Sequence, residues 1–401
     1  MLINNKSIGC VMLMMCIFNA CSLMNENFIF VITMWALTLI AFSNCYRYIN
    51  IDLALLFLWG LSYIVILSYC ETDGILKECV YYLIGPISFF VAGKFYIESH
   101  KNNKEYAFSR AIKIIVIAWL AYSFLSYCYS IKTGAFHENT EVVLDLWGER
   151  PVSRTIMGLY TSPSILFIFF VSGIFLKKNI LKNAMQSVVM ITLFVAGMVV
   201  SIGLGNRTFF AILIIVMICF LAFCFLNGVI RLRTAIASIV VVLCIILGYF
   251  INVFGIRSKF ETSVVFSRIA SEGFNTPRFI MWKEVFSNIF FIPFGSTNSD
   301  ITFPLKYAHN LWVDTLLSCG WIPFVLLVMF SFLVLRKVTF LLRCRELSFE
   351  TRLLVMVLSV IIFCAVFVEP VLLAAPYYLI DITFIIGMLE AIYYSKRKRG
   401  A

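Results

Sequence analysis

The chain has 401 residues, of which 62% are hydrophobic and 13% charged, and its formal net charge is +11. Soluble domains contain about 45–50% apolar and about 25% charged residues. A water-soluble fold of this size cannot bury so large an apolar fraction, which excludes soluble, disordered, fibrous and disulfide-scaffold proteins. The composition predicts an all-α polytopic integral membrane protein.

Apolar runs long enough to cross a bilayer, which takes about 20 residues, recur along the whole chain. Lys77, Glu78 and Pro86 interrupt the fourth run, and only Glu369-Pro370 separates the last two, which predicts a tight hairpin there. We predict about twelve transmembrane helices, at residues 8–24, 28–43, 51–70, 75–97, 111–131, 156–176, 185–204, 208–227, 234–253, 310–335, 352–369 and 371–394.

The positive-inside rule gives the orientation of these helices. If both termini are cytoplasmic, most of the 32 Lys and Arg residues fall in short loops on the inner side. Two long segments then lie outside, at 132–155 and 254–309. The chain therefore divides into 1–253 (helices one to nine and the smaller outer loop), the large outer loop at 254–309, and 310–401 (the last three helices and a basic cytoplasmic tail).

Several arginines lie on the outer side, where the rule expects few. Arg154 opens the sixth predicted span, Arg207 lies between the seventh and eighth, and Arg257, Arg268 and Arg278 belong to the large loop. Arginine binds phosphate through paired hydrogen bonds and stays charged, so a group of them suits a lipid-linked diphosphate. Each one taken singly also fits a side chain that reaches lipid headgroups or solvent.

Arg150 and Arg154 stand on either side of Pro151. Proline fits the first position of a helix, and residues four apart share a helix face. If the segment after Pro151 is helical, these two arginines are expected on one face.

His309 stands just before the tenth predicted span, within KYAHNLWVDTLL. The positive end of a helix dipole disfavours protonation of a histidine there. We therefore expect a neutral imidazole near pH 7, able to accept a proton. The alternative is an interfacial histidine bonded to the backbone. His100 lies in an inner loop and is expected to be solvated.

No other pattern of catalytic residues is present. The chain has no zinc-protease, serine-hydrolase or nucleotide-binding motif, and its 13 cysteines show no metal-ligand spacing. We therefore expect neither a metal site nor a cofactor. Asp314 and Asp381 lie within predicted spans and are the best candidates for an ion site of a transporter, although Asp314 could instead pair with an arginine. Glu390 is expected at the inner interface.

Residues 277–321 resemble the signature segment of the O-antigen polymerase and O-antigen ligase superfamily. The matching positions in this segment are Arg278, Trp282, Pro293, Gly295, His309-Asn310 and Gly320. The stretch RTIMGLYTSPS, from Arg154, resembles the Arg-Gly-Pro entry of that family into a middle span. SIGLGNRTFF resembles its Ser-Arg turn, with Asn206 where serine is usual. The repeated R-x10-G pattern of some members is absent, because Ile165 and Ile289 occupy the glycine positions.

The resemblance implies a metal-independent glycosyltransferase of the bacterial inner membrane that uses undecaprenyl-diphosphate-linked sugars at the periplasmic face. It assigns His309 as general base, Arg278 and Arg207 to the diphosphate, and Arg154 to the same cavity. Arg257, Arg268 and Asn310 are further candidates. The implied partners are lipid-linked repeat units, membrane lipids, and a chain-length regulator and flippase of the same pathway, with no nucleic acid.

The expected function is that of an O-antigen polymerase, which transfers the growing glycan with inversion from undecaprenyl diphosphate onto the next lipid-linked repeat unit. Two alternatives stay open. An O-antigen ligase moves finished polymer to the lipid A core. A flippase or secondary transporter would contain two pseudo-symmetric halves and polar residues at mid-membrane.

Overall fold

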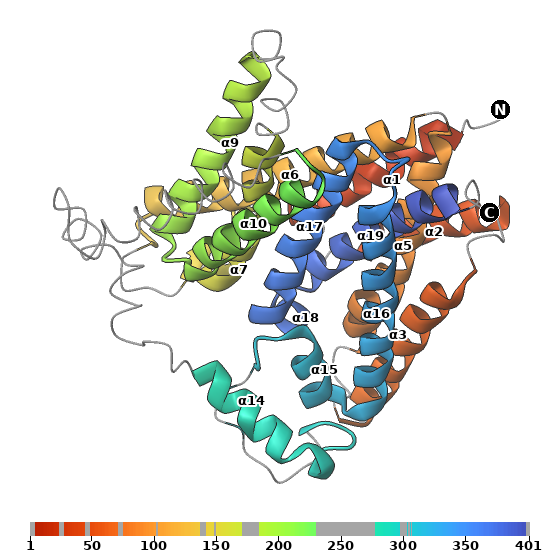
Figure 1. Cartoon of the computed structure of the whole chain (residues 1–401). Coiled ribbons are helices and arrows are strands. Elements are labelled where there is room, and N and C mark those ends of the chain that lie inside the picture. Colours follow the sequence, from red (N-terminus) through yellow and green to blue (C-terminus); the bar gives the residue numbers. More distant parts are fainter. Residues whose placement is uncertain are drawn as a thin grey trace. The chain divides into compact units, whose positions relative to one another are not determined.

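The computed structural model describes residues 5–23, 28–44, 49–70, 75–101, 103–136, 142–147, 150–170, 184–229, 277–296, 303, 305 and 307–397. This part of the chain is all-α except for one short hairpin (Figure 1). It contains eight helices long and apolar enough to cross a membrane. The protein is therefore a polytopic α-helical membrane protein.

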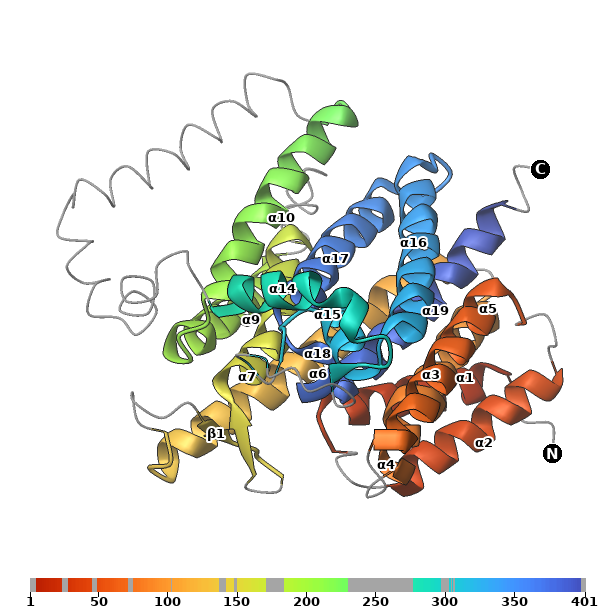
Figure 2. The same cartoon turned by 90° about the horizontal axis from the view of Figure 1, so that it is seen from below.

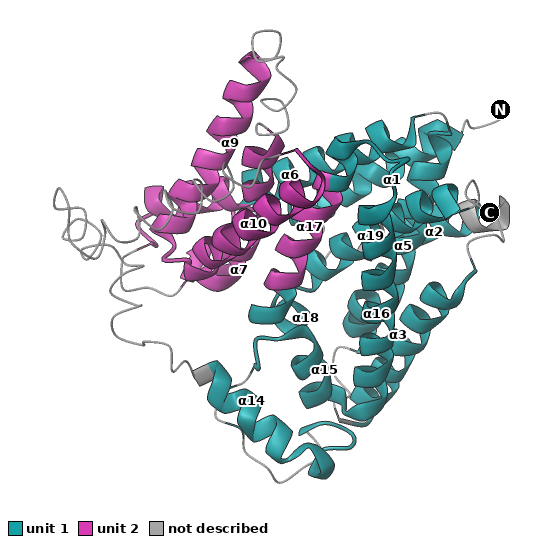
Figure 3. Ribbon diagram, viewed as in Figure 1, with its two compact units in different colours: residues 1–122, 277–352, 366–401 teal, residues 123–276, 353–365 magenta. Residues whose placement is uncertain are grey.

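The chain folds into two compact units (Figure 3). Unit 1 comprises residues 1–122, 277–352 and 366–401, and unit 2 comprises 123–276 and 353–365. The helices of unit 1 are α1 (Asn5–Ala20), α2 (Phe28–Asn44), α3 (Ile51–Cys70), α4 (Ile75–Cys79), the π-helix η2 (Val80–Ile84), α5 (Gly85–Ser99), most of α6 (Lys104–Lys132), α14 (Pro277–Ser287), the short η6 (Ile289–Phe291), α15 (Leu311–Cys319), α16 (Trp321–Arg343), α18 (Val371–Ala374) and α19 (Pro376–Arg397).

Unit 2 contains the end of α6 and the middle of α17 (Phe349–Val368), whose two ends belong to unit 1. Its other elements are β1 (Val142–Leu144), β2 (Pro151–Ser153), α7 (Arg154–Thr161), η3 (Ser162–Ile165), α9 (Ala184–Gly203) and α10 (Arg207–Leu226).

The eight long helices overlap the third, fourth, fifth, seventh, eighth, tenth, eleventh and twelfth predicted spans, and the tenth differs most. The first and second predicted spans are the shorter helices α1 and α2, and the sixth begins at Arg154 and is described to Phe170. The ninth, at 234–253, lies outside the described residues. The total of twelve spans and the sidedness of the chain stay predictions.

The prediction of one continuous helix over 310–335 is wrong. Gly320 has φ +77°, and it separates α15 from α16, which continues to Arg343. A Cβ atom at Gly320 would lie 2.0 Å from the carbonyl oxygen of Pro293. The chain breaks here because the Pro293 segment packs directly on the backbone of this glycine.

The described part of the large loop has its own apolar core on α15. Met281, Val285 and Ile292 from the loop are fully buried against a group of residues that precedes or belongs to α15. These are Ala308, Val313, Leu316 and Leu317. Gly295, at φ +93°, lies so close to α15 that a Cβ would be 2.4 Å from the Ser318 carbonyl oxygen. The loop is thus a packed structure fixed to the α15–α16 junction.

At the centre of unit 1, α5 and α19 pack backbone against backbone. A Cβ atom at Gly93 would lie 2.1 Å from the carbonyl oxygen of Phe384, and one at Gly387 would lie 2.0 Å from that of Phe90. Small residues permit this close approach between membrane helices. Figure 2 shows α19 beside the α3–α5 group, seen from the loop side.

In unit 2, the helix expected from Pro151 begins later. Pro151 pairs with Leu144 in the β1–β2 hairpin, and the first helical residue is Arg154. The Ser153 hydroxyl accepts a hydrogen bond from the Ile156 amide at 3.3 Å, which fixes the helix start. Arg150 therefore lies before a strand and does not share a helix face with Arg154, so that expectation is wrong.

Candidate functional site

His309 lies in a tight turn at the start of α15. Its φ of +56° is left-handed, and the next residue, Asn310, caps the helix. The Asn310 side-chain oxygen accepts hydrogen bonds from the amides of Trp312 and Val313, both at 3.1 Å. Its amide nitrogen donates to the Phe367 carbonyl at 3.0 Å. Asn310, one of the further site candidates, thus connects the His309 turn to the end of α17.

Asp314 binds the backbone on both sides of His309. Its Oδ1 accepts from the Ala308 amide at 2.6 Å and its Oδ2 from the Asn310 amide at 3.1 Å. Burial raises the pKa of Asp314 to about 7, opposed by these hydrogen bonds and one from the His309 amide. From the sequence, Asp314 was a candidate to bind a transported ion or to pair with an arginine. Its bonds to the backbone around His309 were not predicted. The signal in the sequence was an acidic residue in the first turn of the helix after His309.

Arg278, in the first turn of α14, contacts the same end of α17 as the turn that contains His309. Its Nη1 donates to the Val368 carbonyl at 2.5 Å, and its Nη2 is 3.7 Å from Glu369 Oε2. Burial, followed by the positive charge of Arg278, lowers the pKa of His309 to about 4. The imidazole is therefore neutral at pH 7, as expected. The cause is burial and a neighbouring cation, whereas the sequence suggested the helix dipole.

Two further features define the surroundings of His309. Trp282 Nε1 donates to the Ala308 carbonyl at 2.6 Å, which connects α14 to the same turn. Within the described residues, no group lies at hydrogen-bond distance from the buried Nδ1 of His309. This nitrogen thus makes no backbone hydrogen bond in the described part of the chain, and the backbone-bonded alternative finds no support there.

The other two arginines belong to unit 2. Arg154 is buried at the start of α7, with its guanidinium carbon 4.8 Å from the ring centre of Phe136. Arg207 is the first residue of α10 and is half-buried. The two segments touch one helix turn beyond Arg154, because a Cβ at Gly158 would lie 2.4 Å from the Asn206 side chain. Both arginines are thus on elements in direct contact.

Asn206 stands where the resembled family usually has serine. Its side-chain oxygen accepts from the Phe209 amide at 3.3 Å, so it caps α10 immediately before Arg207. Asparagine and serine are both favoured at this position, which explains the exchange. A contact of 2.7 Å between the hydroxyls of Thr161 and Ser201 also holds α7 against α9, the helix that precedes Asn206.

The predicted site residues are thus found as two pairs. In unit 1, Arg278 and the His309 turn contact the same end of α17, and in unit 2, Arg154 and Arg207 lie on touching elements. A single pocket formed by all four stays a prediction. Arg257 and Arg268 lie outside the described residues.

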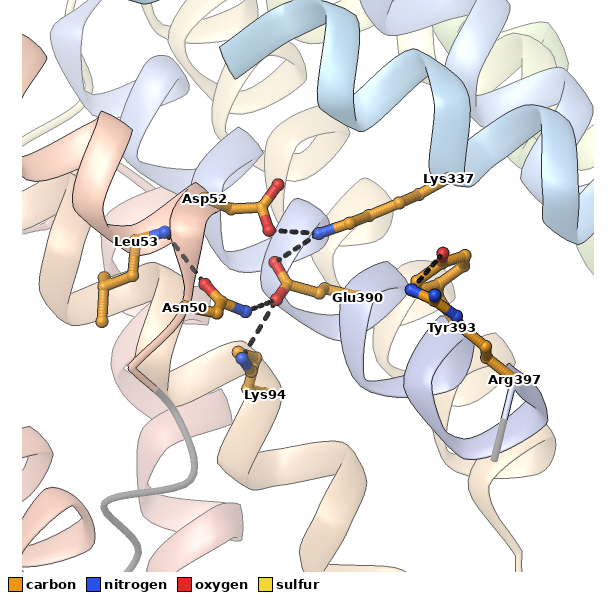
Figure 4. A network of polar contacts seen from close by, with 8 residues as sticks. All are labelled: Asn50, Asp52, Leu53, Lys94, Lys337, Glu390, Tyr393 and Arg397. Atoms are coloured by element: carbon orange, nitrogen blue, oxygen red, sulfur yellow. Dashed lines mark hydrogen bonds and ion pairs between the residues drawn. The ribbon is translucent and has the colours of Figure 1, made fainter. Parts of the chain in front are cut away.

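Unit 1 also contains a buried network of charges that the sequence analysis missed (Figure 4). Lys337 of α16 donates to Asp52 of α3 and lies 3.3 Å from Glu390 of α19. Lys94 of α5 donates to Glu390 at 3.0 Å, and Asn50 donates to the same carboxylate. All four charged residues are buried. Glu390 is enclosed by helices distant in sequence, and its expected position at the inner interface stays a prediction.

Asp381 lies fully buried in α19, among donors that carry no charge. Its Oδ1 accepts from Asn19 at 2.8 Å and from the Cys16 thiol at 3.5 Å, and its Oδ2 accepts from Trp119 Nε1 at 2.8 Å. These contacts join α1, α6 and α19. Across the described ranges, no group of three or more His, Cys, Asp or Glu side chains could hold a metal ion.

No family model matches this chain, and no curated protein matches it in sequence.

Proposed function

We propose that the protein is a polysaccharide polymerase of the O-antigen type, acting on undecaprenyl-diphosphate-linked repeat units at the periplasmic face of the bacterial inner membrane. The observation that carries the proposal is the meeting of Arg278 and the His309–Asn310 turn at the end of α17, where Arg278 binds the Val368 carbonyl and Asn310 the Phe367 carbonyl. Arg278 and His309 both belong to a packed loop beyond the ends of membrane helices. A base and a cation so placed suit attack of a hydroxyl and departure of a diphosphate.

In the proposed step, a hydroxyl of the incoming repeat unit attacks the anomeric carbon of the growing chain. His309 takes the hydroxyl proton as the new glycosidic bond forms. The bond from the anomeric carbon to the diphosphate breaks, and the diphosphate leaves with the electron pair. Attack opposite to the leaving group inverts the anomeric centre.

Arg278 would stabilise the negative charge that grows on the diphosphate. A guanidinium has five N–H donors, so its hydrogen bond to Val368 and its ion pair with Glu369 leave donors for a phosphate. A bound diphosphate would also offset the charge that lowers the pKa of His309. The pKa of the imidazole would then rise when substrate is bound, while burial, the larger cause of its lowering, would continue to act.

The test replaces His309 with Asn, since asparagine tolerates the left-handed backbone of this position. In cells that depend on this protein for polymer, His309→Asn should reduce polymer formation by about 10²–10⁴-fold, because a general base contributes that much. Single repeat units should then remain on the lipopolysaccharide. The matched control is His100→Asn, a half-buried histidine at the end of α5, which should leave polymer unchanged. Normal polymer in the His309 variant would refute the assignment.

The products also separate the proposal from the ligase alternative. Loss of a polymerase leaves single repeat units, some of them transferred to the lipid A core. Loss of a ligase leaves long polymer on its undecaprenyl carrier. The second pattern in the His309→Asn strain would favour the ligase.

A transporter is a second candidate, favoured by the buried charges of Asp52, Lys94, Lys337 and Glu390 inside membrane helices. Such groups often mark ion pathways. Against this, the two acids and two bases pair with one another, as in a structural clamp. Purified protein in sealed vesicles decides between them. Elongation of lipid-linked units without an ion gradient supports the polymerase, and gradient-dependent movement without elongation supports the transporter.

A further inference from the structure

The outer loop exposes a cluster of phenylalanines. Phe290 is 80% exposed and Phe291 71%, and three more phenylalanines of the same segment are at least half exposed. We call Phe279, Phe286, Phe290, Phe291 and Phe294 the Phe patch. So many exposed phenylalanines in one short segment are unusual on a protein face that meets water, and they indicate an interaction site.

One end of the Phe patch is fixed to the outer end of α16. The ring centres of Phe290 and Trp321 are 5.8 Å apart. The Trp321 amide donates to the Pro293 carbonyl at 3.1 Å, and Trp321 Nε1 donates to the Ile289 carbonyl at 2.9 Å. Trp321 is the first residue of the span, where tryptophan typically lies at the membrane–water interface.

The apolar surface continues from the Phe patch onto α16. Exposed residues recur along one face of this span at intervals of three and four, which is a lipid-facing stripe. They are Ile322, Val325, Met329 and Phe332. The stripe begins at the residue after Trp321, so the Phe patch adjoins surface that lies in lipid.

The other end of α14 is fixed to the outer end of α17. The ring centres of Trp282 and Phe367 are 5.4 Å apart, and Arg278 donates to the Val368 carbonyl. The α16–α17 connection, with Arg343, Arg345 and Arg352, lies at the opposite ends of both helices. The α14–η6 segment therefore crosses the ends of two spans on one side of the membrane, and Figure 1 shows α14 running crosswise to α16.

We infer that the Phe patch inserts into the outer leaflet of the bilayer, so that α14 and η6 lie in the membrane interface. An interfacial helix buries its apolar side chains about 5–10 Å into the boundary between headgroups and acyl chains. The occupant is the bilayer itself, since the patch continues the lipid-facing stripe of α16 and is held by two span ends. Exposed Lys283, on the same helix, suits anionic headgroups.

The test uses the full chain in vesicles of phosphatidylethanolamine and phosphatidylglycerol. The photoreactive phenylalanine analogue p-benzoylphenylalanine replaces Phe290 or Phe294, and mass spectrometry detects lipid adducts after irradiation. The same analogue at Ile322 is the positive control, because adducts there show correct insertion. At Glu284 it is the matched negative control, since this exposed residue lies on the opposite side of α14 from Phe286.

We expect lipid adducts at positions 290, 294 and 322 and no adducts at position 284. Adducts at 322 but not at 290 or 294 would show that the Phe patch faces water. Cross-linked pairs of chains would show that a second copy covers it. Either result overturns the inference. Neither bears on glycosyl transfer, because no activity is measured.

Discussion

Asp314 and His309 form one structural unit, in which the buried carboxylate binds the amides on either side of the histidine. The Ala308 amide lies 2.6 Å from Oδ1 and the Asn310 amide 3.1 Å from Oδ2. The left-handed backbone conformation of His309 is unfavourable for residues other than glycine, so surrounding groups must stabilise it. Asp314 provides that support and is a positioning residue for the imidazole.

The two residues should give opposite dependences of stability on pH. The pKa of Asp314 is raised from 3.8 to about 7, so its contribution to stability is complete below 3.8 and is lost as pH rises to 7. The pKa of His309 is lowered from 6.5 to about 4, so its contribution is complete above 6.5 and is lost as pH falls to 4. Between pH 4 and 6.5 the two effects oppose each other.

Single substitutions separate these effects. The unfolding free energy of Asp314→Asn, relative to that of the wild-type protein, should increase as pH rises from 4 to 7. The slope should be at most about 1.4 kcal/mol per pH unit. His309→Asn should show the reverse trend between pH 4 and 6.5. Thermal unfolding in detergent measures both. Parallel curves for all three proteins would contradict the assigned pKa directions.

Replacement of Gly320 by Ala should destabilise the protein strongly. The left-handed backbone costs about 1–2 kcal/mol for a side chain, and the clash with the Pro293 carbonyl adds about 1–3 kcal/mol. Gly134→Ala is the matched control, because its φ is +69° and no described atom lies within 4 Å of the added Cβ. Gly134→Ala should lose only the free energy that the left-handed backbone costs, without the contribution of the clash. Equal shifts in the unfolding temperature of the two variants would mean that the Pro293–Gly320 packing contributes little.

Replacement of Arg278 by Lys tests whether this side chain binds the diphosphate. Under the proposed function, polymer formation should fall by about 10²-fold, because a lysine cannot bind phosphate through two parallel bonds. Glu369→Gln is the comparison, since it removes the charge partner of Arg278 while keeping a similar shape. Polymer should persist in that variant. If both variants lose polymer equally, Arg278 acts by anchoring α14 to the end of α17. Gel analysis of lipopolysaccharide measures the outcome.

Lys337→Met should destabilise the network of Figure 4 by about 3–5 kcal/mol, because it leaves the buried Asp52 without this cation. The control is Lys396→Met, which removes the more exposed pair with Glu105 and should cost about 0–1 kcal/mol. Unfolding in detergent compares the two. Similar small losses would show that water or another group compensates Asp52.

The sequence alone predicted much of the fold, because the length and apolarity of a membrane span are local properties of the chain. Spans such as 51–70 and 185–204 match the observed helices to within a residue. The resemblance of residues 277–321 also drew attention to Arg278 and His309, and Arg278 and the His309 turn contact the same end of α17. The break at Gly320 was missed, because the carbonyl that demands a glycine belongs to Pro293, outside the span.

The sequence by itself therefore determined the class of protein, the positions of most helices and the residues worth testing. The tertiary structure decided which charges pair and which residue supports His309. Lys94 and Glu390 are 296 residues apart, and the sequence suggests only that each lies near the inner surface. The packing of the helices shows that they pair and are buried together. Hydrophobic length is set by neighbours in sequence, whereas the partner of a buried charge is set by whichever helices lie against it.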